Sequence, residues 1–314
     1  MQNVPNPKFH MWHVRLADST SNKEFVVDKY EFTYDRQPDS LGMSEGNDVD
    51  LNFRKVFLPE EGHLLVSRDF KGQELRILAN LSGEPSWIKT FLEGGDIHKQ
   101  TAISIFGEEN YKSELRSVAK TINFGLVYGM EYQSLAAKLG IPEKEAKAHI
   151  SKFFEANKGI DNYLKSQATY GAQHKEIKNL YGRKRRLHRD YDVVRGFLNS
   201  GRRKAYNFPI QSMGAEIMKL GLLKLYYNIL TKEEYKDKVY FMSMIHDEIN
   251  LSVDKSVLNE ICFKLGQEMT HHIPGMPVPI ITDLAIGTSM GLIWSFNQDP
   301  ETLELTPVII PYND

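Results

Sequence analysis

The order of strand-like and helix-like segments restricts the fold of this chain more than any other feature of its sequence. Residues 63–69, HLLVSRD, form a short apolar run typical of a buried strand, and residues 73–82 follow with apolar positions at helical spacing. Residues 96–166 are then mostly helical in pattern. Breaks in this stretch are expected at Gly107, at Gly129 and at Gly140-Ile141-Pro142.

Strand-like residues return only late in the chain. Residues 212–230 form another amphipathic helix, and the runs VYFMSMI (239–245) and INLSV (249–253) flank a tight polar turn as the strands of a hairpin. Residues 18–50 are polar, acidic and mixed in period, which predicts a loop or insertion with little core. A strand, many helices and then a hairpin predict a mixed α+β fold, in which a helical insertion separates two parts of one sheet.

Size and composition exclude several classes of protein. A chain of 314 residues predicts roughly two lobes with a substantial core, and its 41% hydrophobic and 25% charged residues argue against a mainly disordered protein. The sequence has no apolar stretch of about 18 residues and no secretion signal at its start, so we predict neither a membrane span nor secretion. Because Cys262 is the single cysteine, an internal disulfide and a Cys-rich zinc site are excluded.

Charge is unevenly distributed along the chain. The formal net charge is −2, but residues 171–204 carry eleven Lys and Arg against three acidic residues. Residues 17–50 carry three basic and nine acidic residues, and residues 254–314 carry two and eight. A focused basic stripe can follow a phosphate backbone, although a solvated surface helix and loop have the same composition.

Three carboxylates are placed where a sheet can present them. Asp69 ends the first strand, and Asp247 and Glu248 lie at the tip of the predicted hairpin. If the two strands are neighbours, these carboxylates converge, and oxygen ligands of this kind suit Mg²⁺ and two-metal phosphoryl transfer. Taken singly, an Asp at the end of a strand is more often a turn former.

Residues 115–129 combine a core-facing stripe with a cationic and aromatic one. Arg116, Lys120, Phe124 and Tyr128 are spaced by four and form a slowly turning stripe on a helix. Cations near a helix start need an anionic partner, which a polyphosphate supplies, and an aromatic ring can stack on a base. An ordinary amphipathic helix with core aromatics is the alternative. The residues expected to face the core are Leu115, Val118, Ile122 and Leu126.

The basic stretch itself contains YGRKRRLHRD (181–190) and GRRK (201–204). Beside the carboxylates and the cationic helix, these side chains are expected to contact the phosphates of a nucleic-acid strand. A nuclear-type address or a solvated loop is the alternative interpretation. The sequence lacks a Walker-type phosphate loop, which argues against an ATPase.

These motifs resemble those of family A DNA polymerases, the group of bacterial DNA polymerase I and related phage enzymes. DFKGQELR (69–76) resembles the first palm motif, RSVAKTINFGLVYG (116–129) the fingers helix, and MIHDEI (244–249) the second palm motif. The resemblance runs from about residue 52 to residue 295. Further matching segments are GDIH (95–98), LYGRKRR (180–186), RKAYNFPIQSMGAEIMK (203–219) and PIITDLAIGTSMGLIWS (279–295).

The resemblance implies the fold of a right-hand polymerase, with an antiparallel palm sheet and a large helical fingers insertion, but without a thumb or exonuclease. The expected regions are an N-terminal palm edge with an acidic insertion (1–51), a first palm segment (52–95), fingers (96–193), a second palm segment (194–295) and a C-terminal tail (296–314).

Carried over residue by residue, the resemblance implies a catalytic centre. Asp69 and Asp247 would hold two Mg²⁺ ions, with Glu248 as a supporting carboxylate. Arg116 and Lys120 would grip the triphosphate, and Lys120 would neutralise or protonate the departing pyrophosphate.

The resemblance also implies contacts to the nucleotide and to DNA. His98 would assist on the phosphate side, Glu74 would exclude a ribose 2′-hydroxyl, and Phe124 would pack against the sugar. Tyr128 would stack near the templating base and gate its entry. Expected contacts to primer and template are Gln2, Asn3, Arg203, Asn207, Gln211 and His246.

The chain departs from the family pattern in two places. Gly72 and Gln73 replace the usual Gln-Ile pair, although the spacing from Asp69 to Glu74 is kept. The first five residues, MQNVP, resemble the family's Leu-Gln-Asn-Ile-Pro motif, and the family's preceding Thr-Gly-Arg segment is missing. We therefore expect a gene split at this motif, with a second polypeptide that carries the thumb and possibly an exonuclease.

The predicted function is DNA-templated DNA synthesis in replication, with primer-template DNA and dNTPs as partners, in the cytoplasm of a bacterium or a phage-infected cell. Two alternatives stay open. One is a catalytically idle DNA-binding fragment. The other is a single-subunit RNA polymerase, although those enzymes lack a glutamate at the position of Glu74 and usually continue His-Asp with Ser, where this chain has Glu248.

Overall fold

The computed structural model describes residues 9–15, 26–32, 53–192, 196–290 and 292–308, and the chain divides into two compact units, Met1–Phe57 and Leu58–Asp314. Gln2 and Asn3, which were expected to contact DNA, lie outside the described residues. The first unit contains the antiparallel strands β1 (Phe9–Arg15) and β2 (Val26–Phe32) and the 3₁₀ helix η2 (Phe53–Val56). The predicted loop over 18–50 is therefore wrong at β2, whose sequence VVDKYEF is rich in β-branched and aromatic residues that favour strands.

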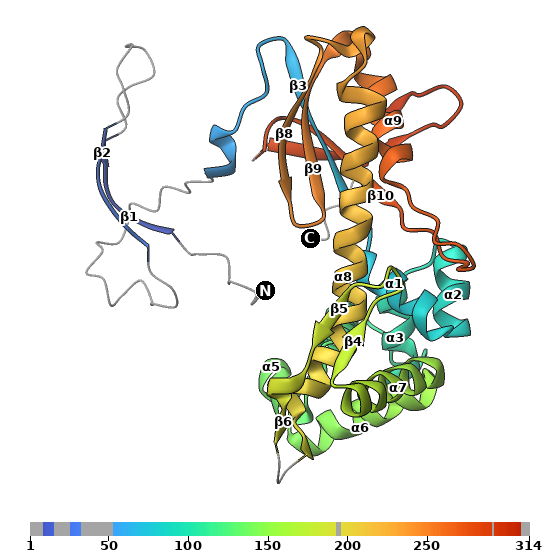
Figure 1. Cartoon of the computed structure of the whole chain (residues 1–314). Helices are drawn as coiled ribbons and strands as arrows, with labels where there is room; N and C mark the ends of the chain where they lie inside the picture. Colours follow the sequence, from blue (N-terminus) through green and yellow to red (C-terminus); the bar gives the residue numbers. More distant parts are fainter. Residues whose placement is uncertain (1–8, 16–25, 33–52, 193–195, 291, 309–314) are drawn as a thin grey trace. The chain divides into compact units, whose positions relative to one another are not determined.

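A six-stranded antiparallel sheet organises the second unit (Figure 1). The strand order is β12-β11-β10-β3-β9-β8, so the first strand of the unit lies inside the sheet rather than at its edge. Segments that are far apart in the sequence are neighbours in this sheet, because β3 pairs with both β9 and β10. The strand bounds are β3 His63–Phe70, β8 Val239–Ile245, β9 Glu248–Asp254, β10 Thr282–Ser289, β11 Leu292–Gln298 and β12 Leu305–Pro307.

The two faces of the sheet have different chemistry. Side chains alternate along a strand, so Val66 of β3 and Leu251 of β9 point to one face and are fully buried in the main core. Helix α9 (Leu258–Met269) packs against β3, β9 and β10 and contributes buried residues to the same core. Ser67 and Asp69 point to the opposite face. Burial of the apolar face fixes the register and thereby the positions of the polar side chains on the other face.

A helical insertion connects β3 to β8, as the sequence predicted. Gly83, Gly107 and Gly140 follow helix ends with positive φ angles that favour glycine. The predicted α+β class is confirmed, with an antiparallel sheet and a large helical insertion. The helices of the insertion are α1 Gln73–Ser82, α2 Pro85–Leu92, α3 Ile97–Phe106, α4 Ser113–Val127, α5 Tyr132–Leu139, α6 Glu143–Ala156 and α7 Lys158–His174.

Helix α8 (Asn199–Leu225) runs from the insertion to the sheet (Figure 1) and is longer than predicted, since the sequence placed its start at residue 212. Its buried positions recur every fourth residue from Gly201 to Leu225. Because an α-helix has 3.6 residues per turn, this stripe rotates around the helix by about 40° per step. The first half of α8 therefore has no single apolar face from which the sequence could have predicted it. Pro209 lies inside the helix and lacks the N–H that an interior residue normally donates.

Short elements complete the second unit. The hairpins β4 (Glu176–Lys178) with β5 (Lys184–Arg186), and β6 (Tyr191–Asp192) with β7 (Gly196–Phe197), precede α8. No helix in the described part of the chain is long and apolar enough to cross a membrane. The remaining short helices are η3 His188–Asp190, the π-helix η4 Tyr226–Leu230, η5 Glu233–Tyr235 and η6 Lys255–Val257.

Candidate active site

A row of carboxylates crosses three strands of the sheet. In the antiparallel register, Asp69 of β3 lies opposite Glu248 of β9 on one side and opposite Asp283 of β10 on the other. Directly opposed residues share a face, so these three side chains belong to one surface. The hydroxyl of Ser67 donates a 2.9 Å hydrogen bond to Glu248 Oε1 on that face. The expectation that the first strand and the hairpin are neighbours is therefore confirmed.

Asp247 joins this row through the turn between β8 and β9. The turn consists of His246 and Asp247, because Ile245 and Glu248 are the last paired residues of the two strands. His246 has a φ of 56°, in the left-handed region, and its side chain is exposed. The N–H of Phe70 donates to the carbonyl oxygen of Asp247 at 3.2 Å, which ties the hairpin tip to the end of β3.

Asp283 was missed by the sequence reasoning. It lies within a segment that resembles the family, but no local pattern distinguishes it from other acidic residues. Only the pairing of β10 with β3 places it beside Asp69, and only a prediction of that register would have found it. Lys71 Nζ lies 3.1 Å from Asp283 Oδ1, so the charge of this lysine neutralises part of the negative charge of the carboxylate row.

The crowding of carboxylates has an electrostatic consequence. Burial, followed by the charges of Asp247, Glu248 and Asp283, raises the pKa of Asp69 to about 7, although the N–H of Phe70 opposes this. Such a shift means that a cation at Asp69 would relieve repulsion between like charges. The donor set, all carboxylate oxygen, is the set that Mg²⁺ prefers.

The structure also limits how a metal could be held. Among the described residues, no three His, Cys, Asp or Glu side chains already form a group that could bind a metal ion. Mg²⁺ is commonly bound through one or two carboxylates, with water and substrate phosphates as the other ligands. Asp69 and Asp247 therefore fit Mg²⁺ that is shared with a phosphate substrate, rather than a closed structural metal site.

Helix α4 presents the predicted cationic stripe. Arg116 and Lys120 are exposed and Ile122 and Leu126 are buried, as predicted. Phe124, which was predicted on the outward stripe, is instead partly buried and packs against the core. Partly buried side chains, Val118 among them, pack against the same core. The alternative of an amphipathic helix with core aromatics agrees with the position of Phe124 but does not account for the exposed cations at the start of the helix.

A protein carboxylate already lies beside the first of these cations. Arg116 Nε donates to Asp96 Oδ2, and Asp96 is also the N-cap of α3, where it accepts from the N–H groups of His98 at 2.8 Å and Lys99 at 3.2 Å. Burial opposes ionisation of Asp96, but these hydrogen bonds and the Arg116 charge hold its pKa below the usual range. The sequence predicted that Arg116 needs an anionic partner, which a polyphosphate could supply, and in the structure Asp96 lies in that position.

His98 lies between α3 and α4 as a neutral ring. Burial lowers the pKa of His98 to about 4, and the positive charges of Arg116 and Lys120 act in the same direction. The negative charge of Asp96 acts against this shift. Its Nδ1 lies 3.0 Å from Asn123 Nδ2, and its ring centroid lies 5.8 Å from that of Phe124. Since the Asn123 amide nitrogen is a donor, Nδ1 accepts and the ring proton resides on Nε2.

Tyr128, the residue that ends α4, meets Glu74 of α1. The Tyr128 hydroxyl donates to Glu74 Oε2 and also forms a hydrogen bond with Gln211 of α8. Burial raises the pKa of Glu74, which the Tyr128 hydrogen bond partly offsets, and burial together with Glu74 raises the pKa of Tyr128. Tyr128 is half-buried rather than fully outward as the four-residue stripe predicted.

The residues expected to contact DNA on α8 recur every four positions. Arg203 and Gln211 are exposed, and Arg203 Nη1 lies 3.7 Å from Glu131 Oε1. The Oδ1 of Asn207 is buried and has no hydrogen-bond partner in the described part of the chain. Gly129 packs tightly here, because a Cβ at that position would lie 2.8 Å from the Arg203 side chain. The structure therefore brings these α8 residues to the end of α4.

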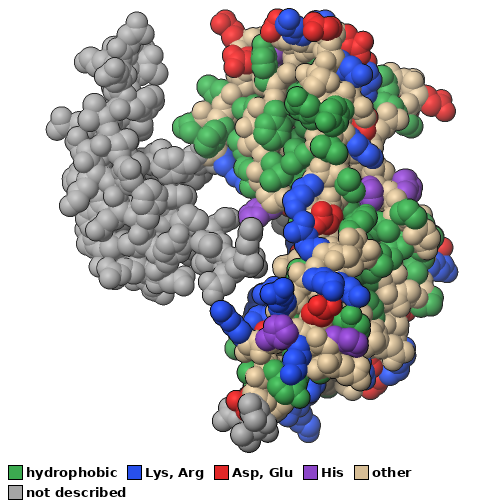
Figure 2. All heavy atoms as spheres, viewed as in Figure 1, with side chains coloured by type: hydrophobic (Ala, Val, Ile, Leu, Met, Phe, Trp, Pro, Cys, Tyr) green, Lys and Arg blue, Asp and Glu red, His purple; other side chains and the backbone are tan. Residues whose placement is uncertain are grey.

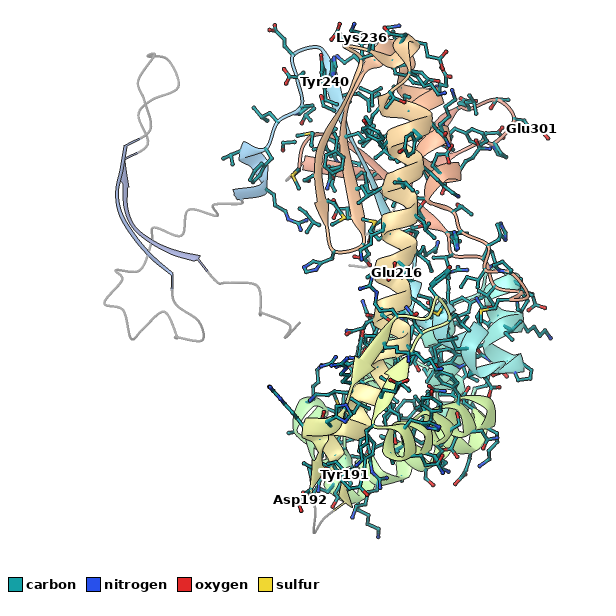
Figure 3. The ribbon with its side chains drawn as sticks, viewed as in Figure 1. Tyr191, Asp192, Glu216, Lys236, Tyr240 and Glu301 are labelled. Atoms are coloured by element: carbon teal, nitrogen blue, oxygen red, sulfur yellow. The ribbon has the colours of Figure 1, made fainter. Side chains whose placement is uncertain are left out.

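The basic stretch is partly neutralised by the protein itself. Lys184 pairs with Glu176 at 3.1 Å, Lys204 pairs with Asp190 at 2.6 Å, and Arg183 pairs with Glu216, which Figure 3 labels on α8. Other cations remain exposed, including Arg185 and Arg186 of β5. Figure 2 shows Lys and Arg side chains gathered over the part of the surface where the β4–β5 hairpin meets α8. The local excess of positive charge is thus smaller than the composition indicates.

Comparison with known proteins identifies similar chains. The model of the family described as DNA polymerase family A matches residues 42–292. DNA polymerase I of Streptococcus pneumoniae is 39% identical over 238 residues, which are 73% of this chain and 26% of that protein. The thermostable DNA polymerase I of Thermus aquaticus is 34% identical over 236 residues, which are 74% of this chain and 28% of that protein.

A solved structure is similar as well. The POL domain of Pol1 from M. smegmatis, in complex with DNA primer-template and dNTP, matches with a TM-score of 0.68 and 27% identity over 76% of this chain and 42% of that one. The chain spans less than a third of the length of the two curated relatives and less than half of this solved chain.

Proposed function

This chain belongs to DNA polymerase family A, and we propose that it is a DNA-templated DNA polymerase catalytic subunit, composed of palm and fingers, that acts in DNA replication. The first palm segment (52–95) contains β3, α1 and α2, and the second (194–295) contains α8, β8, β9, α9 and β10. The fingers (96–193) contain the helices from α3 to α7. The observation that carries the proposal is the convergence of Asp69, Asp247 and Glu248 on one face of an antiparallel sheet, in a chain that also presents the Arg116 and Lys120 stripe.

The reaction is attack of a primer 3′-hydroxyl on the α-phosphate of a paired dNTP. A phosphodiester bond forms as the bond to pyrophosphate breaks. Asp69 and Asp247 would hold two Mg²⁺ ions, which, when bound, activate the attacking hydroxyl and stabilise the leaving oxygen. Glu248 supports this centre from the next strand, with Ser67 fixing its orientation.

The fingers act on the triphosphate. Arg116 and Lys120 bind its charges, and Lys120 neutralises or protonates pyrophosphate as it leaves. His98 supports this step as a neutral donor through Nε2–H, because its lowered pKa and its contact with Asn123 leave that proton free to donate. Phe124 packs against the sugar from the same helix face.

Nucleotide selection and DNA contacts involve both regions. Glu74 blocks a ribose 2′-hydroxyl, and Tyr128, which donates to it, stacks near the templating base. The remaining contacts to primer and template are assigned to Gln2, Asn3, Arg203, Asn207, Gln211 and His246. We further propose a second polypeptide that supplies the thumb and possibly an exonuclease, in keeping with the longer relatives.

Primer extension with Mg²⁺ tests the proposal, first with the chain alone and then with a polypeptide that carries the thumb. Asp69→Ala and Asp247→Ala should each lower extension by about a thousandfold or more, since each removes a ligand of the two-metal centre. Asp161→Ala is the matched control, because Asp161 pairs with Lys165 on α7, away from the carboxylate row. Undiminished extension by either Ala variant would refute the mechanism, and DNA binding without any extension would favour an idle fragment.

A further inference from the structure

A pocket of the second unit includes Arg68, whose side chain lies on the opposite face of the sheet from Asp69, and Asp283, the β10 end of the carboxylate row. Its volume is about 510 Å³, and it is bounded by α9, β10 and β11. Arg68 reaches it from β3, because successive side chains alternate and Arg68 therefore points away from the face of Asp69. We call this cavity the Arg68 pocket. Its polar lining includes Arg68, Gln267, Thr270, His272, Asn297 and Gln298.

Within the described part of the chain, the hydrogen-bond partners of the Arg68 guanidinium are neutral. Nη2 donates to the carbonyl oxygen of Cys262 at 2.8 Å, and Nη1 donates to Thr282 Oγ1 at 3.3 Å. Nε is buried and has no hydrogen-bond partner among the residues that the structure describes. Among the described residues, no ion pair includes Arg68, and Asp283 at the rim of the pocket pairs instead with Lys71.

A largely buried cation that makes no ion pair with any described residue is unfavourable. Burial lowers the pKa of Arg68, and the nearby Asp283 offsets this only in part. Removing a charge from water is costly unless an opposite charge or several hydrogen bonds compensate for it. A perturbed charged group at a cavity that is lined by polar side chains is the pattern of a ligand site.

Helix α9 is shaped to accommodate this cation. A Cβ at Gly266 would lie 2.8 Å from Arg68 Cζ and 2.8 Å from Nη2, so only glycine permits the guanidinium to lie against the helix. Glycine inside a helix costs about 0.5–1 kcal/mol relative to alanine. The helix and the strand thus both accommodate an arginine that forms no ion pair with a described residue.

We propose that the Arg68 pocket binds a phosphate group, as inorganic phosphate or as the phosphate of a small nucleotide. A guanidinium presents N–H donors in a planar fork that matches phosphate oxygens, and it is less strongly hydrated than an ammonium group. Gln267, Thr270 and Asn297 add neutral hydrogen-bonding groups around it. The volume is within the range of small-molecule sites, and Lys71 offsets the one carboxylate at the rim.

Calorimetric titration of the full chain at constant ionic strength tests this proposal, with inorganic phosphate and deoxyadenosine monophosphate as probes and sodium chloride as the blank. We expect saturable phosphate binding that weakens at least tenfold in Arg68→Met, with an intermediate affinity in Arg68→Lys. Equal affinity for both probes identifies phosphate alone as the ligand, and tighter nucleotide binding identifies a nucleotide.

Two controls separate this pocket from the candidate active site and from misfolding. Because Arg116 is assigned to the triphosphate site on α4, any binding that Arg116→Ala removes belongs to that site, and the binding that Arg68→Met weakens should persist in Arg116→Ala. If Arg68→Met does not fold, Gln267→Ala, which changes an exposed residue of α9, should weaken binding at least threefold. The proposal is overturned if the unaltered chain shows no saturable phosphate binding. It is also overturned if a folded Arg68→Met variant binds phosphate as tightly as the unaltered chain. If Arg68→Met does not fold, unchanged affinity in Gln267→Ala overturns it.

Discussion

The palm sheet and the fingers helix distribute charge in opposite ways. In the palm, Asp69 lies between Glu248 and Asp283, and the crowding, together with burial, raises the pKa of Asp69 to about 7. In the fingers, Arg116 is paired with Asp96, whose pKa is lowered. The palm therefore has an excess of negative charge that a cation would relieve, whereas some of the fingers charge is already balanced within the protein.

This difference implies different costs of ligand binding. A cation that enters the palm relieves repulsion between carboxylates, so binding improves the local electrostatics of the folded chain. A triphosphate that binds Arg116 has to share or replace an existing carboxylate contact. Lys120 is exposed one turn further along the same helix, and we expect it to contribute more to catalysis than Arg116 does.

Lys120→Ala is the strongest test of the fingers side. Loss of a cation that stabilises the charge on departing pyrophosphate should lower the rate of single-turnover extension by about a hundredfold to a thousandfold. Lys138→Ala is the control, since Lys138 is an exposed lysine at the end of α5. An unchanged rate in Lys120→Ala would remove this residue from the catalytic centre.

Glu74→Ala tests the point where the two regions touch. Tyr128 at the end of α4 donates to Glu74 on α1, so removal of the carboxylate opens the space assigned to the sugar. We expect incorporation of ribonucleotides relative to deoxyribonucleotides to rise by about tenfold to a hundredfold. Tyr128→Phe, which keeps the ring and removes the hydroxyl, should have a smaller effect. Equal discrimination before and after Glu74→Ala would exclude the assigned role.

The pH dependence of cation binding tests the palm side. Because the pKa of Asp69 is raised to about 7, the carboxyl keeps its proton below that pH, and the proton competes with the cation. Affinity for Mn²⁺, followed by electron paramagnetic resonance without DNA, should rise by at most about tenfold per pH unit below pH 7 and level off above it. Asp69→Asn should abolish this rise, and persistence of the rise would assign it to another group.

The raised pKa of Asp69 also affects the folding stability of the chain when no cation is bound. The folded chain keeps a proton on Asp69 that the unfolded chain releases near its ordinary pKa of 3.8. The contribution of Asp69 to the free energy of unfolding should therefore fall as the pH rises from about 4 to about 7, so the free energy of the unaltered chain should fall relative to that of Asp69→Asn over this range. Denaturant unfolding curves across this range measure the difference.

Asp96→Asn should have the smallest effect. Asparagine is a good N-cap, so the substitution preserves the start of α3 while it weakens the pair with Arg116. If Asp96 competes with the triphosphate, the KM for dNTP should fall by about twofold to fivefold. A higher KM would mean that Asp96 positions Arg116 for its substrate. Asp161→Asn, which alters the ion pair with Lys165 on α7, is the control.

Local patterns in the sequence were sufficient for most elements of the second unit. The strand ending near Asp69, the helix that starts at Gln73 and the hairpin around Asp247 are all present, because each has a periodicity or turn that depends only on near neighbours. The start of α8 was missed because its buried stripe winds around the helix. The strand β2 was missed because acidic residues obscured its tendency to form a strand.

The sequence by itself determined the type and order of these elements and the residues of the family motifs, because both are properties of short stretches of chain. Only the tertiary structure decided which charges meet. Asp283 beside Asp69 and Asp96 beside Arg116 depend on strand register and helix packing. Arg68 against Gly266 depends on the same long-range packing. Such contacts join residues that are distant in sequence, and burial of the apolar face of the sheet fixes the register of its strands.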